Sequence, residues 1–239
     1  MSVCEITLSA NAGIALQFGS LRMWSDALHT EKVPGFSTVS PALAQAIRRD
    51  PHFAAPDLIF YTHCHPDHYS RALTREALTR WPQARVLLPE PGLEGQIPIR
   101  GARGHLALGS LDVEFCRLPH DGRRYADVVQ YGYLLTAGGV RILAPGDCPA
   151  GCPEAEPLVN GDPPDLALLN FPWITLPRGR RFLERCLPGT RLLIFHLPLA
   201  EDDRWGYRRA AEQACSRLPW HPDVRLLRAP LQQEELDLQ

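Results

Sequence analysis

The chain has 239 residues, of which 45% are hydrophobic and 22% are charged, with a formal net charge of −2. This composition is that of an ordinary globular protein, which excludes a disordered chain, and the charge excludes a strongly basic nucleic-acid-binding surface. No apolar run approaches the roughly 18 residues that a membrane helix needs, and the N-terminal residues lack a signal-peptide pattern. We therefore expect a soluble, cytoplasmic protein that binds neither nucleic acid nor membranes.

The first part of the chain predicts short strands separated by turns, with two helices. Ser40 and Pro41 supply an N-cap and a first helical position for a helix ending near Arg49. Ser70 similarly begins a helix that runs to about Trp81, and residues 27–40 predict a loop. Apolar runs bounded by turn residues predict strands over Glu5–Leu8, Ile14–Phe18, Leu21–Ser25, Asp57–Tyr61 and Ala84–Leu88.

The second part begins with residues 90–110, whose five glycines and two prolines predict loops. Helices are predicted over Arg178–Leu187 and Asp203–Leu218, and the acidic, polar tail from about residue 229, above all from Leu231, is expected to fray. No repeat or linker divides residues 1–239, so we predict a single α/β layered domain. Strands are predicted over Leu111–Arg117, Tyr131–Thr136, Val140–Ala144, Asp165–Asn170, Arg191–Phe195 and Val224–Leu227.

The seven cysteines follow no disulfide-framework spacing, and we interpret them as mostly buried thiols. Only Cys148 and Cys152 form a close pair, and without a second pair they are a weak metal signal.

The most informative segment is Thr62-His-Cys-His-Pro-Asp-His68, directly after a predicted strand. It concentrates three of the nine histidines and one aspartate within six residues, which favours a ligand cluster over a polar loop of satisfied histidines. Neutral imidazole and carboxylate groups suit zinc, iron or manganese.

This segment resembles the His-x-His-x-Asp-His signature of the metallo-β-lactamase fold superfamily of metal-dependent hydrolases. Further residues match that family's pattern in order along the chain. His120 and His196 match its later histidines, Asp147 matches its bridging aspartate, and Asp26 matches its early aspartate, which supports the site from behind the ligands.

The resemblance implies a four-layer αββα sandwich of two mixed sheets with helices outside, and a site with two divalent ions, zinc first and manganese or iron as alternatives. His63, His65 and His120 would hold one ion, and Asp67, His68 and His196 the other, with Asp147 bridging. A hydroxide shared by the ions would then cleave a small-molecule ester, lactone or phosphate ester, with Asp67 orienting the water and shuttling its proton.

Two alternatives remain: a di-iron redox enzyme with the same ligands, although no attached flavin domain is evident, and a non-catalytic metal-binding domain. Within the superfamily the chain looks most like the branch of L-ascorbate-6-phosphate lactonase. Neither the substrate nor the oligomeric state is predicted from the sequence.

Other residues give weaker signals. His29 and Trp173 are candidates for the substrate pocket, although Trp173 is equally compatible with a core position. His52 and His221, each next to a proline, are predicted to be exposed loop residues. Six arginines could either bind an anionic group of the substrate or face solvent, and we favour solvent. They are the arginines at positions 117, 123, 124, 178, 180 and 181.

Overall fold

The computed structural model describes residues 2–30, 33–159, 161–218, 221 and 223–238. The chain divides into two compact units. Unit 1 comprises the residues up to Ile99 together with His196–Trp205 and Leu227–Leu238, and unit 2 comprises Arg100–Phe195 and Gly206–Leu226. Within the described residues each unit holds one seven-stranded mixed sheet.

The sheet of unit 1 has the strand order β14-β1-β2-β3-β4-β5-β6. β14, β1, β2 and β3 pair antiparallel, whereas β3, β4, β5 and β6 run parallel. The bounds are β1 Ser2–Leu8, β2 Ile14–Phe18, β3 Leu21–Ser25, β4 Leu58–Phe60, β5 Arg85–Leu88, β6 Ile97–Pro98 and β14 Gln233–Leu238. The parallel strands matter for function, because their carboxyl ends lie along one edge of the sheet.

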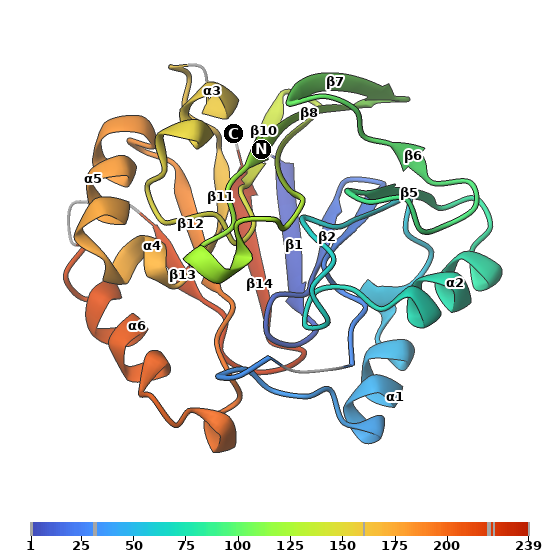
Figure 1. Ribbon diagram of the computed structural model, residues 1–239, viewed down its shortest axis with the longest axis horizontal. Coiled ribbons are helices and arrows are strands. Elements are labelled where there is room, and N and C mark those ends of the chain that lie inside the picture. The colour runs from blue at the N-terminus through green and yellow to red at the C-terminus, as the bar shows by residue number, and fades with distance from the viewer. Residues whose placement is uncertain (1, 31–32, 160, 219–220, 222, 239) are drawn as a thin grey trace. The chain divides into compact units, whose positions relative to one another are not determined.

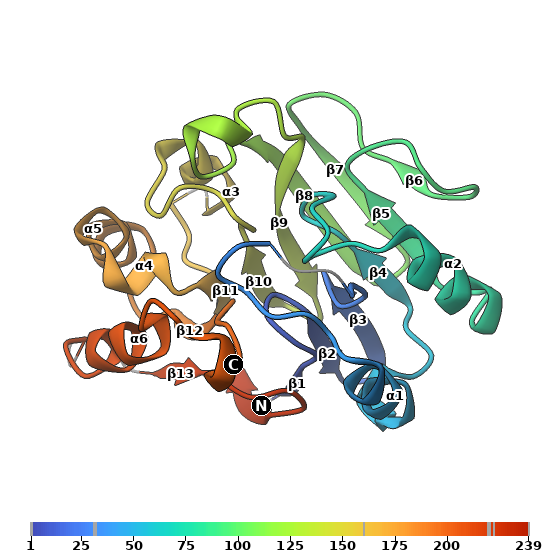
Figure 2. The ribbon, with the colours of Figure 1, turned by 60° about the horizontal axis from the view of Figure 1, so that its bottom comes forward.

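Two helices, α1 (Pro41–Arg49) and α2 (Arg71–Arg80), lie beside β3, β4 and β5 (Figure 2). Both begin as predicted, since the Ser40 hydroxyl accepts a hydrogen bond from the Leu43 N–H and the Ser70 hydroxyl accepts one from Leu73. A short 3₁₀ turn, η1 (Pro51–Phe53), follows α1. The helices bury Ile47 and Ala77 against Trp24 of β3, which forms the core on this face of the sheet.

The sheet of unit 2 has the strand order β13-β12-β11-β10-β9-β8-β7, antiparallel from β7 to β10 and parallel from β10 to β13. The helices α4 (Pro172–Thr175), α5 (Pro177–Cys186) and α6 (Tyr207–Cys215) lie beside β12 and β13 (Figure 1), and α3 spans Glu156–Val159. The strands are β7 Arg103–Leu108, β8 Leu111–Leu118, β9 Gln130–Ala137, β10 Val140–Ala144, β11 Leu166–Asn170, β12 Arg191–Phe195 and β13 Val224–Leu226, with short 3₁₀ turns at η2 Arg123–Tyr125, η3 Pro153–Ala155 and η4 Ala200–Asp202, the last in unit 1.

The expected fraying of the tail from about residue 229 is wrong. Residues Gln233–Leu238 form β14, which pairs antiparallel with β1 along its length. Leu236 and Leu238 alternate with acidic residues and are buried, whereas Asp237 is exposed. The acidic composition therefore belongs to the outer face of a strand whose inner face completes the core of unit 1.

Three smaller predictions also need correction. Residues 90–110 are not all loop, because they contain β7, which pairs with β8 in a hairpin. The residues of β7 alternate between exposed and half-buried positions, and the glycines of this region obscure that alternation in the sequence. The helix predicted over Asp203–Leu218 is shorter and begins at Tyr207. His221 is buried rather than exposed, and His52 is half-buried.

All seven cysteines lie in the described part of the chain and are thiols, and Cys4, Cys116, Cys148 and Cys152 are buried. Among the described residues, none of the helices combines the length and the apolar character needed to cross a lipid bilayer.

Candidate metal centre

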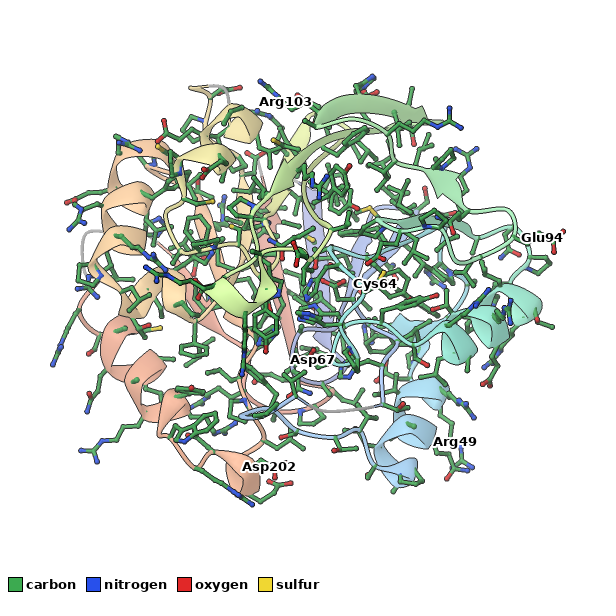
Figure 3. The ribbon with its side chains drawn as sticks, viewed as in Figure 1. Arg49, Cys64, Asp67, Glu94, Arg103 and Asp202 are labelled. Carbon is green, nitrogen blue, oxygen red and sulfur yellow. The ribbon has the colours of Figure 1, made fainter. Side chains whose placement is uncertain are left out.

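The loop between β4 and α2 carries the His63–His68 segment, in which Cys64 and Asp67 are labelled in Figure 3. The backbone turns back on itself at Pro66, because the N–H groups of His68 and Tyr69 both donate to the carbonyl of His65, at 3.0 and 2.9 Å. Asp26 follows the neighbouring strand β3, and its N–H donates to the carbonyl of Phe60, the last residue of β4. The ends of two parallel strands thus bring Asp26 to the histidine loop.

Five candidate ligands lie together in unit 1. His63 Nε2 is 3.1 Å from His65 Nδ1, and the ring centroids of His63 and His68 are 4.0 Å apart. His196, which directly follows β12 in the chain, places its Nε2 atom 2.9 Å from Nε2 of His68. Asp67 Oδ2 is 4.0 Å from each of these two nitrogens. All except the half-buried His65 are buried.

The chemistry of this cluster fits a divalent cation. Asp67, His68 and His196 each offer one ligand atom, and the three atoms lie within 4.8 Å of one another. The Oδ1 atom of Asp67 is buried and accepts no hydrogen bond from the described residues. Burying a carboxylate without a compensating partner is costly, and a cation bound to the cluster would supply that compensation.

The Thr62 hydroxyl fixes which nitrogen of His63 carries the proton. It donates its single hydrogen to Oδ2 of Asp26 at 2.8 Å and lies 3.0 Å from Nδ1 of His63. Because the hydroxyl hydrogen is used on the carboxylate, the imidazole must donate in the second contact. Nδ1 of His63 is therefore protonated, and Nε2 keeps the electron pair that a metal ligand needs.

Asp26 also orients His68. Its Oδ2 atom lies 3.3 Å from Nδ1 of His68, which favours a proton on that nitrogen and leaves Nε2 directed toward His196. Asp26 is itself held by Thr62, whose N–H donates to Oδ1 at 2.9 Å. One buried carboxylate thus sets the tautomer of His63 through Thr62 and lies beside the Nδ1 atom of His68.

Left-handed backbone conformations occur at this cluster. Asp26 has φ 49° and His196 has φ 61°, values that residues other than glycine rarely adopt. The N–H of His196 donates to the carbonyl of Asn11, which has φ 46°. The Asn11 side chain in turn bonds the backbone of Ser37 at both its amide atoms. Strain of this kind persists where surrounding contacts impose it, and it is concentrated at functional sites.

The two remaining candidate ligands, His120 and Asp147, lie in unit 2 and are joined through Asp121. His120 Nδ1 donates to the Asp121 carbonyl at 2.8 Å, so that Nε2 keeps its electron pair. The Asp121 N–H donates to the carbonyl of Asp147 at 2.8 Å. Asn170, the last residue of β11, donates its side-chain N–H to Oδ1 of Asp147 at 3.2 Å.

No family model matches the chain, and no curated protein sequence matches it either. Solved structures do match. The metallo hydrolase Igni18 of the archaeon Ignicoccus hospitalis is 16% identical, with a TM-score of 0.69 over 99% of this chain and 100% of that one. The metallo-β-lactamase fold protein YhfI of Bacillus subtilis is 13% identical, with a TM-score of 0.63 over 98% of this chain and 100% of its own. The chain has the metallo-β-lactamase fold.

A third match, the diiron β-hydroxylase CmlA of Streptomyces venezuelae, is 17% identical, with a TM-score of 0.60. The alignment covers 99% of this chain and 54% of CmlA. These likenesses confirm the predicted fold class, whereas the narrower likeness to the lactonase branch stays a prediction.

The residues with weaker sequence signals, His29, Trp173 and the arginines, lie in three different environments. His29 is buried, its Nε2 atom is 3.1 Å from the Ala10 carbonyl, and burial lowers the pKa of its imidazole to about 4. Trp173 is fully buried in unit 2 and packs edge-on against Phe182. Of the flanking arginines, Arg180 donates to the carbonyls of Ile174 and Thr175 at the end of α4.

Residues that sequence reasoning did not select include Thr62, Asn11, Ser37 and Asn170. Thr62 precedes the first histidine of the motif and Asn11 lies 15 residues before Asp26, so position in the sequence gives no sign of the partners of either residue. Their roles become visible only when residues far apart in the sequence meet, as Thr62 and Asp26 do.

Proposed function

We propose that this protein is a metal-dependent hydrolase that acts on a small-molecule ester, lactone or phosphate ester. The observation that carries the proposal is the buried carboxylate of Asp67. Its Oδ1 atom has no hydrogen-bond partner among the described residues, and its Oδ2 atom lies 4.0 Å from the Nε2 atoms of His68 and His196. A cluster of acceptor atoms in a buried site is stabilised by a cation, and a cation held there on this fold can activate water for hydrolysis.

We assign one ion to Asp67, His68 and His196, and a second to His63, His65 and His120, with Asp147 bridging the two. Zinc is the expected metal, and manganese and iron suit the same ligands. The tautomers support this assignment, because His63 and His120 each protonate Nδ1 and offer Nε2. Strand pairing supports the assignment too. Asn170, which donates to Asp147, pairs with Phe195 across β11 and β12, and His196 is the next residue after Phe195.

Bound divalent ions would lower the pKa of a water toward neutrality and polarise the carbonyl or phosphoryl oxygen of the substrate. In this scheme the Asp67 carboxylate orients the attacking water and accepts its proton. It then returns the proton to the departing oxygen of the alcohol as the ester bond breaks. Asp26 and Thr62 hold the imidazoles in place, so that the histidines need not rearrange during the reaction.

The test combines metal analysis with turnover. We expect the purified protein to retain two metal equivalents, to hydrolyse at least one member of an ester, lactone and phosphodiester panel, and to lose that activity on chelation. Asp67→Asn removes the proton acceptor and should abolish turnover. Asp112→Asn makes the same change on an exposed position of β8 and should not. Bound metal with no turnover of the whole panel would instead support a non-catalytic metal-binding domain.

A redox function is the second candidate, because the diiron hydroxylase CmlA shares this fold. The two functions differ in their metal and in their spectra. Two iron equivalents with an optical or Mössbauer signal of a coupled pair, and no hydrolysis, would favour the redox function. Zinc with hydrolysis would exclude it.

A further inference from the structure

A pocket of about 160 Å³ lies in unit 1 beside the metal cluster. Two segments form it: the loop that precedes α1, and the end of η4 with the turn that follows it. Neither segment contains a candidate ligand named above. The pocket is lined by Pro34, Gly35, Phe36, Asp202, Arg204 and Trp205.

One wall of this pocket is an aromatic side chain that would ordinarily be buried. Trp205 is 58% exposed, the largest exposed fraction among the large hydrophobic side chains described. One edge of its indole lies against the backbone of Gly35, because a Cβ atom built on Gly35 would come within 2.1 Å of the Cζ3 atom of the ring. Gly35 also has φ +98°, which glycine alone adopts without strain. This glycine therefore allows the backbone to approach the edge of a ring that is itself more than half exposed.

A second wall of the pocket contacts one of the candidate metal ligands. The ring of Phe36 packs edge-on against the imidazole of His196, with the ring centroids 4.2 Å apart and the planes at 90°. The same loop is anchored next to the cluster, since the Ser37 hydroxyl accepts a hydrogen bond from the Leu199 N–H at 2.8 Å. A group in the pocket would thus be one side chain away from a candidate ligand.

The size and the charge of the pocket indicate what it holds. A cavity of about 150 Å³ is large enough to bind benzene, so this pocket has room for one aromatic ring. Aromatic walls favour a ring through edge-to-face and offset contacts. The rim carries Arg204 and Asp202, one charge of each sign, which favours an uncharged group over an anion or a cation.

We propose that this pocket binds an uncharged aryl group of the substrate, with the bond to be cleaved directed past Phe36 toward His196. The inference rests on the proposed hydrolase function for the reaction, but the binding of the ring does not require turnover. It names the substrate class as aryl or arylalkyl esters rather than short alkyl esters.

Binding is tested first, on the full chain and without turnover, with benzyl alcohol as the probe and cyclohexylmethanol as its aliphatic match. Ligand-detected NMR titrations should show benzyl alcohol binding to the wild type, and cyclohexylmethanol binding more weakly. Trp205→Ala should weaken benzyl alcohol binding about tenfold, whereas Trp205→Phe keeps a ring and should stay within about threefold. Because Trp205 is largely exposed, neither change should disturb folding.

A second arm uses Gly35→Ala, in which the added methyl group displaces the indole, and which should weaken binding as Trp205→Ala does. The kinetic arm compares benzyl acetate with ethyl acetate, and the ratio of their kcat/KM values should fall about tenfold in Trp205→Ala. Equal binding of benzyl alcohol by wild type and Trp205→Ala would overturn the inference. Ring binding without hydrolysis of any ester would leave the inference standing and overturn only the proposed function.

Discussion

The two units hold their candidate ligands in different ways. In unit 1, His63, Asp67, His68 and His196 are buried, and a chain of side-chain hydrogen bonds through Asp26 and Thr62 orients the imidazoles. In unit 2, His120 and Asp147 are half-buried and are held by the backbone of one residue, Asp121, and by the side chain of Asn170. The imidazoles of unit 1 are thus oriented by side-chain hydrogen bonds, whereas backbone carbonyl and N–H groups help to hold the candidate ligands of unit 2.

The strongest test of this difference is the removal of one ligand from each unit. His68→Ala deletes the imidazole that contacts both His196 and Asp26, and we expect metal affinity and activity to fall about 1000-fold or more. His120→Ala should leave the first ion of unit 1 in place and remove about one metal equivalent. Elemental analysis after dialysis against a chelator measures both.

The control for these two variants is His105→Ala, because His105 is an exposed histidine that pairs with Asp112 on the edge of the other sheet. It should retain the metal content of the wild type. If His68→Ala retained two equivalents, unit 1 would not be the primary site.

The burial of unit 1 also predicts a pH dependence of stability. Burial lowers the pKa of His29 to about 4, below its ordinary value of 6.5. The unfolded chain therefore takes up a proton at higher pH than the folded one, so the free energy of unfolding decreases as the pH falls from about 6.5 to about 4 and levels off below that. The expected loss is about 3 kcal/mol.

The variant His29→Gln keeps a donor for the Ala10 carbonyl and removes the titration. Urea unfolding between pH 4 and pH 7 should show a smaller decrease in stability for this variant than for the wild type. His105→Gln, in which an exposed histidine of unit 2 is changed, should follow the wild type. Identical slopes in wild type and His29→Gln would contradict the assignment of the decrease to His29.

Local signals in the sequence account for most of the fold. The N-caps at Ser40 and Ser70 bond to residues only three positions further on. The strands β2, β3, β10 and β12 lie between turn residues, and the predicted bounds of these four strands agree with the structure to the residue. β14 was missed because what orders it lies at the other end of the chain. Its leucines are buried only when Leu236 faces Cys4 across the sheet. From its composition alone, the same segment is predicted to be a solvated tail.

The candidate site divides in the same way. Four candidate ligands fall within six residues, from His63 to His68, where a contiguous motif reveals them. The role of Thr62 does not show in the sequence, because its partner Asp26 is 36 residues away. The same holds for Asn11, whose side chain bonds Ser37, 26 residues later. Candidate ligands that are neighbours in the sequence can be predicted from it, whereas the residues that orient those ligands are identified only in the folded structure.

Thr62 gives the third test, which separates orientation of a ligand from its presence. Thr62→Val keeps the shape of the side chain and removes the hydroxyl between Asp26 and His63. We expect metal affinity, measured by competition with a chelator, to fall about 10- to 100-fold. Thr62→Ser restores the hydroxyl and should recover most of the affinity.

A spectroscopic readout distinguishes this effect from a general loss of packing. Imidazole ¹⁵N shifts should report His63 protonated on Nδ1 in the wild type and in Thr62→Ser, and a mixture of tautomers in Thr62→Val. Unchanged tautomers in Thr62→Val would show that the hydroxyl does not set the protonation of His63.

The smallest expected effect lies in unit 2, and it decides whether the two units really differ. Asn170→Ala removes a side-chain donor to Asp147, a neutral amide whose hydrogen bond contributes about 0.5–1.5 kcal/mol. Metal affinity should therefore fall only about 2- to 10-fold, because the Asp121 N–H still holds the backbone of Asp147. If Asn170→Ala were instead as damaging as Thr62→Val in the same chelator competition, the donors of unit 2 would be as strictly oriented as those of unit 1. The contrast drawn between the two units would then be wrong.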